Sequence, residues 1–197
     1  MINTVKHATQ TLTAMPVWAH IGATAAVFAG FQGVKAALDA SYAASKHPVD
    51  FMTGQLAFSA EKIEGYYSVM QNAGTLNIYL RTQIIDFGFI LSVALLGLCL
   101  GSLLGRIGPV GGIARKVGLG VALLACTGAA LDAAENLLSF GMLMRPETIP
   151  TGLAIMYSGV AAAKFACLVP AVFGAGATAL IGFSERALNV LRGPVMA

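Results

Sequence analysis

The sequence predicts an all-α membrane protein: a four-transmembrane-helix bundle with an extra amphipathic helix in the long outer loop between spans one and two. Of its 197 residues, 57% are hydrophobic and only 11% are charged, against roughly a quarter charged in soluble domains. The charges gather in short segments and leave four long apolar stretches, and about 18 or more such residues indicate a spanning helix. These stretches are apolar all round, unlike the helices of a soluble bundle.

We expect a single membrane domain, residues 1–197, with spans at about 15–38, 79–105, 117–143 and 151–183. The first stretch is too long for the hydrophobic region of a typical signal peptide. Tyr79, Arg81 and Asp86 predict an interfacial collar where the second span begins. The sequence therefore predicts a multi-pass protein with one long connection, between spans one and two, and two short ones.

The loop between the first two spans predicts a helix at about 60–72. Ser59 is a suitable N-cap, Glu61 lies in the first turn, and Gly74 follows the end. Its apolar residues recur with helical spacing at Ile63, Tyr66, Tyr67 and Met70. Such a helix either packs along the membrane interface or over the mouth of the bundle, or it serves as a lid or a docking surface for a partner.

The basic residues of the short connections predict the orientation, because lysine and arginine mark the cytoplasmic or matrix-like side. The tail after the fourth span carries Arg186 and Arg192 against one acid, Glu185. Both termini then lie on that side of a bacterial inner membrane or an organelle inner membrane. The connection between spans two and three contains no acid, and its basic residues are expected to contact anionic lipid headgroups: Arg106, Arg115 and Lys116.

Small residues predict where the helices approach closely, since close packing of backbones holds helices together in lipid. Gly97, Gly101 and Gly105 form a ladder on the second span, and Gly22 and Gly30 lie on the first. One interpretation is a compact bundle. The other is that one ladder, most favourably that of the second span, contacts a neighbouring chain.

Four polar residues inside the last two spans predict an intramembrane cluster: Asp132, Glu135 and Asn136 on the third and Lys164 on the fourth. Ionisable groups at such depths cost several kcal/mol unless they are paired. At ~1.5 Å per residue, Asp132 and Lys164 each lie roughly 16–20 Å from the connecting turn, so antiparallel neighbours bring them together. His20 on the first span is a further candidate member.

Two interpretations of this cluster remain open. It is either a structural ion pair that holds the third and fourth spans in register, or a proton or substrate relay. In the relay, Lys164 neutralises one acid while the other takes up and releases a proton.

Short motifs run from the loop helix to the fourth span: F-S-A-E at 58–61, Tyr79 followed by Asp86 and Phe87, L-D-x-x-E-N at 131–136, and Lys164 with Phe165. In these motifs the chain resembles a family of uncharacterised small four-helix integral membrane proteins, mainly bacterial. The resemblance implies the same topology and the same polar residues. It implies no activity, substrate or cofactor.

Two classes of function follow. The chain is either a non-catalytic subunit or scaffold of a larger membrane assembly, packing through its small-residue faces, or a small oligomeric transporter, channel or proton-coupled carrier that uses Asp132, Glu135 and Lys164. No nucleophile with a base, phosphate-binding loop or metal-ligand spacing is present, so we expect no enzyme, cofactor or metal site. The expected partners are membrane lipids and other membrane subunits or further copies of the chain. Nucleic acid is not expected, because the basic connections explain the net charge of +3.

Overall fold

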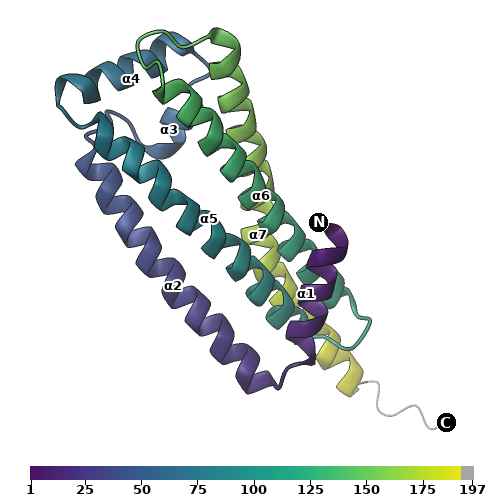
Figure 1. Ribbon diagram of the computed structural model, residues 1–197. Helices are drawn as coiled ribbons and strands as arrows, with labels where there is room; N and C mark the ends of the chain where they lie inside the picture. The colour runs from purple at the N-terminus through teal and green to yellow at the C-terminus, as the bar shows by residue number, and fades with distance from the viewer. Residues whose placement is uncertain (192–197) are drawn as a thin grey trace. The chain divides into compact units, whose positions relative to one another are not determined.

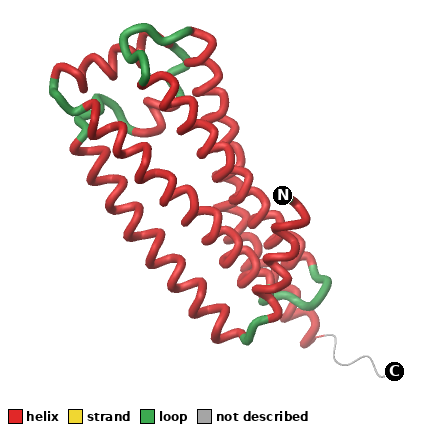
Figure 2. Tube along the Cα trace, viewed as in Figure 1, coloured by secondary structure: helices red, strands yellow, loops and turns green. Residues whose placement is uncertain are grey.

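The computed structural model describes residues 1–191, and over that range the chain forms helices joined by loops and turns, with no strand (Figures 1 and 2). Arg192, expected on the inner side, lies outside the described residues. The helices of the described range are α1 Ile2–Ala14, α2 Val17–Ala44, α3 Phe51–Gln55, α4 Ala60–Asn72, α5 Leu76–Gly105, α6 Ile113–Leu143 and α7 Thr151–Leu191.

Four of these helices, α2, α5, α6 and α7, are long and apolar enough to cross a membrane, which confirms the four expected stretches. Each helix is longer than its apolar stretch. α2 continues to Ala44, and Lys46, with a positive φ of 57°, follows its end. α7 continues to Leu191, so Glu185 and Arg186 belong to a helix rather than to a tail.

Two further helices, α1 and α3, were not predicted. α1 ends because Met15 precedes Pro16 and takes an extended conformation (φ −65°, ψ 154°). α3 begins after its N-cap Asp50, whose carboxylate accepts hydrogen bonds from the backbone N–H and the hydroxyl of Thr53. These hydrogen bonds lower the pKa of Asp50. Neither helix contains an apolar repeat long enough to reveal it in the sequence.

Contacts within the chain group it into two compact units. The first unit contains Met1–Ala29, Val93–Thr127 and, within the described range, residues 167–191. The second contains Gly30–Ser92 and Gly128–Ala166. Each of the four long helices therefore contributes one segment to each unit.

In the first unit, α5 and α6 touch through glycine. A Cβ added at Gly101 would lie 2.5 Å from the carbonyl oxygen of Gly118, and a Cβ at Gly97 would collide with Ala125. At Gly105 it would lie 3.3 Å from the Cα of Arg115. The ladder of the second span thus packs against α6 of the same chain, which leaves it no room for a neighbouring chain.

Gly22 and Gly30 on α2 differ from this pattern. A Cβ added at either position would meet no atom within 4 Å, and both residues are exposed. Within the described chain they therefore mark no close helix contact, although they lie eight residues apart, twice the spacing of the α5 glycines.

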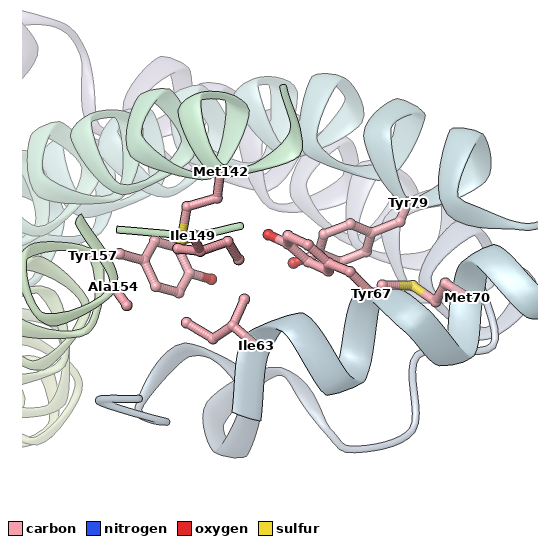
Figure 3. Close-up of a cluster of buried hydrophobic side chains, with 8 residues drawn as sticks. All are labelled: Ile63, Tyr67, Met70, Tyr79, Met142, Ile149, Ala154 and Tyr157. Carbon is pink, nitrogen blue, oxygen red and sulfur yellow. The ribbon is translucent and has the colours of Figure 1, made fainter. Parts of the chain in front are cut away.

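The second unit is closed at one end by α4, the expected loop helix. Ser59 caps it, its hydroxyl accepting from Lys62 N at 3.3 Å. Three of the predicted stripe residues, Ile63, Tyr67 and Met70, are at most 3% exposed. Figure 3 shows them gathered with side chains from α5, α6, α7 and the segment before α7: Tyr79, Met142, Ile149, Ala154 and Tyr157. The stripe is therefore occupied inside the unit, and Glu64 adds a hydrogen bond from Ile149 N at 2.7 Å.

The tight α5–α6 contact makes a prediction about two neighbouring glycines of α6. Gly118→Ala places its methyl group against the carbonyl of Gly101, whereas Gly120→Ala meets no atom within 4 Å. We expect Gly118→Ala to lower the stability by about 1–3 kcal/mol, as overpacking does, and Gly120→Ala to leave it unchanged. Thermal unfolding of both variants in a mild detergent measures this, and equal stabilities would show that the α5–α6 contact is loose.

Candidate functional site

Six side chains of the second unit form what we call the buried ion network: Asp86 from α5, Asp132, Glu135 and Asn136 from α6, Lys164 from α7 and Gln55 from α3. The five residues of the long helices are 9% exposed or less. Gln55 is partly buried. The network thus joins three candidate spans to the short connecting helix α3.

The ammonium group of Lys164 lies at the centre of the network. Its Nζ donates to Asp132 Oδ1 at 3.0 Å and to Gln55 Oε1 at 3.0 Å. Glu135 Oε2 lies 2.5 Å away, close enough for an ion pair but without hydrogen-bond geometry. An ammonium offers three donors, and three oxygen atoms surround this one. The structure therefore brings Asp132, Glu135 and Lys164 together, as their spacing predicts.

Asn136 extends the network to α5. Its Nδ2 donates to Asp86 Oδ2 at 2.7 Å and lies 3.4 Å from the carbonyl oxygen of Gln83. Asp86 also interacts electrostatically with Asp132 and Lys164. Asp86, expected in an interfacial collar, is buried among these side chains, ten residues after the start of α5.

The network contains more negative than positive groups. Lys164 balances one of the three carboxylates of Asp86, Asp132 and Glu135, and all four groups are shielded from solvent. A buried carboxylate without a balancing charge costs several kcal/mol. Neutrality therefore requires the network to hold additional protons or a bound cation, and this excess is its most distinctive chemical property.

The structure does not bring His20 to this network. His20 belongs to the first unit, where its Nε2 lies 3.1 Å from the carbonyl oxygen of Cys99 and 3.1 Å from Ser102 Oγ. Arg106 donates to its Nδ1 at 3.3 Å and to the carbonyl of Met15 at 2.9 Å. Because an arginine only donates, Nε2 holds the proton and donates to Cys99. His20 is thus held by polar groups of its own unit.

The three basic residues expected at lipid headgroups differ in their exposure and in their hydrogen-bond partners. Arg106 is bound to Met15 and His20 inside the first unit. Lys116 is exposed. Arg115 is partly buried, and its Nε has no hydrogen-bond partner among residues 1–191. Arg115 and Lys116 remain the better candidates for contact with anions.

Gln55 and Asp86 were missed in the sequence for different reasons. Gln55 lies on a helix of five residues, which leaves no periodic signal. Asp86 lies ten residues after the start of α5. The expected span began at Tyr79, which placed Asp86 nearer to the end of the helix than it is. A signal was available for Asp86, namely its position in the D-F motif that the family resemblance uses.

The charge balance predicts that lysine is the network's most sensitive position. Lys164→Met leaves three buried carboxylates without a cation, and we expect it to destabilise the protein by about 3–5 kcal/mol. Adding Asp132→Asn should recover part of that loss. Lys35→Met is the matched control, because Lys35 pairs with Asp39 on the exposed side of α2 and such pairs contribute about 0–1 kcal/mol. Equal effects of the two lysine substitutions in thermal unfolding would contradict the network.

In comparisons with protein-family models, curated proteins and solved structures, the chain matches none. The resemblance to small four-helix bacterial membrane proteins therefore stays a prediction that rests on the short motifs alone.

Proposed function

We propose that the protein is a small proton-coupled carrier of the membrane, and that it binds and releases protons at the buried ion network. The observation that supports this is the excess of carboxylates over ammonium groups among residues that are 9% exposed or less. A membrane protein keeps such a cluster at a cost of several kcal/mol, and intramembrane ionisable groups typically serve ion or proton movement.

The network suggests a division of roles among its acids. Asp132 and Glu135 both lie against the ammonium of Lys164, which balances one of their two charges. Asp86 instead accepts from the amide of Asn136, a neutral partner that tolerates both the ionised and the protonated acid. Asp86 is also the most exposed of the three at 9%, against 5% and 1%. We assign proton exchange to Asp86 and charge compensation to Lys164.

Gln55 supports a route between the network and water. Its side chain bonds Lys164, while its helix α3 belongs to the segment that connects α2 to α4. Gln55 is only partly buried and contacts the buried ammonium of Lys164, so an ordered water molecule at its amide would connect the network to solvent.

A second candidate function is that of a non-catalytic subunit or scaffold, and the exposure of α2 favours it. Only 11% of the most apolar window of α2 is buried, against 22% to 39% for the other three candidate spans. In the second unit, one side of α2 exposes only small residues: Gly33, Ala36, Ala37 and Ala40. Such a face admits a partner helix at short distance.

Proton uptake into liposomes tests the carrier proposal. With the protein reconstituted around a pH-sensitive dye, we expect an imposed potential to drive proton entry, and Asp86→Asn to reduce the rate roughly tenfold or more, since it removes the exchanging group. Asp39→Asn is the control, because Asp39 is exposed. Wild-type flux equal to that of empty liposomes, or unchanged flux in folded Asp86→Asn, would contradict the proposal.

The mass of the protein in mild detergent tests the subunit proposal. Gly33→Leu should leave the fold intact, because no atom lies within 4 Å of a Cβ at that position, and it should release the protein from any assembly that uses the α2 face. Gly65→Leu, equally open on α4, is the control. If the wild-type protein extracted from its native membrane migrates as a free monomer, the α2 face has no partner.

A further inference from the structure

The first unit contains a cavity of about 150 Å³ beside the unpartnered arginine. α1 forms one wall, and the adjoining parts of α5 and α6 form the others. The polar side chains and the one aliphatic side chain that line it are Thr9, Gln10, Thr13, Ser102, Arg115 and Leu119. The volume exceeds that of a single water molecule and admits a group as large as a phosphate.

Among residues 1–191, Arg115 is the only charged residue that lines the cavity. Its Nε is shielded from solvent and has no hydrogen-bond partner in the described chain. None of the ion pairs found among residues 1–191 includes Arg115. A guanidinium remains charged at any physiological pH, so a shielded N–H without an acceptor is unfavourable until an acceptor arrives.

The hydroxyl groups of the cavity are already in use as donors. Thr9 donates to the carbonyl of Lys6, Thr13 to that of Thr9, and Ser102 to that of Leu98. The donors available to a ligand are therefore the guanidinium and the exposed amide of Gln10. No acid belongs to the lining within residues 1–191, so the single charge beside the cavity is the positive charge of Arg115.

We propose that this cavity binds a phosphate-type oxyanion, held by the guanidinium of Arg115 and assisted by Gln10. A planar guanidinium with several N–H groups binds two oxygen atoms of a phosphate at once. In a chain with four candidate spans, the nearest abundant source is the headgroup of an anionic phospholipid, and free phosphate is the other. The site depends on α1, so its occupant would hold α1 against α5 and α6.

Lipid binding to the purified full-length protein in a neutral detergent tests the site. The probes are short-chain phosphatidic acid, phosphatidylcholine as the zwitterionic reference, and inorganic phosphate, with bound molecules counted by native mass spectrometry. We expect Arg115→Gln to weaken phosphatidic acid binding roughly tenfold, and Arg115→Lys to weaken it less, because lysine keeps the charge but loses the bidentate geometry. Lys116→Gln removes the same charge from the exposed neighbouring residue and should change the affinity by less than about twofold.

Equal losses in Arg115→Gln and Lys116→Gln would overturn the proposal, because diffuse surface charge would then explain the binding. Equal affinity for phosphatidic acid and phosphatidylcholine would overturn it as well. Competition by inorganic phosphate would assign the site to the free ion, and its failure to compete would assign the site to the lipid. If Arg115→Gln does not fold, Gln10→Ala serves instead, and unchanged binding in that variant would exclude the cavity.

Discussion

The interaction on which the second unit depends is the ion pairing of Lys164. Its ammonium joins α7 to Asp132 and Glu135 of α6 and reaches Gln55 of α3. Asn136, one residue after Glu135, continues the connection to Asp86 of α5. Three long helices and the connecting segment are thereby held through side chains that are almost fully withdrawn from solvent. Because a charge in such surroundings is tolerated only with its partners in place, these contacts fix the register of the helices.

The parts of the structure that could be predicted from the sequence are those governed by helix periodicity. The apolar stretches locate α2, α5, α6 and α7, and the spacing of Ile63, Tyr67 and Met70 locates α4 and its buried side. The constant rise of a helix is enough to bring Asp132 and Lys164 to one depth, and they meet at 3.0 Å. α1 and α3 escaped prediction because polar or very short helices are stabilised by tertiary contacts rather than by an apolar repeat.

Helix periodicity shows which residues share a face, but it does not show which other helix that face contacts. Gly101 and Gly30 were both predicted to mark close helix contacts, yet Gly101 lies against Gly118 while a Cβ added at Gly30 would meet no atom within 4 Å. His20 lies on an apolar helix as Lys164 does, yet its partners are Cys99, Ser102 and Arg106 of the first unit. Both outcomes depend on which helix faces which, and a single sequence contains no direct signal of that arrangement.

We infer that the buried ion network holds exchangeable protons because its carboxylates outnumber its ammonium group. Infrared spectroscopy of the purified protein in lipid measures this directly, since a protonated carboxylic acid has a carbonyl band that shifts when water is replaced by deuterium oxide. We expect such a band at neutral pH and its loss or weakening when Asp86 is replaced by asparagine. A spectrum that contains only ionised carboxylates at neutral pH would contradict it.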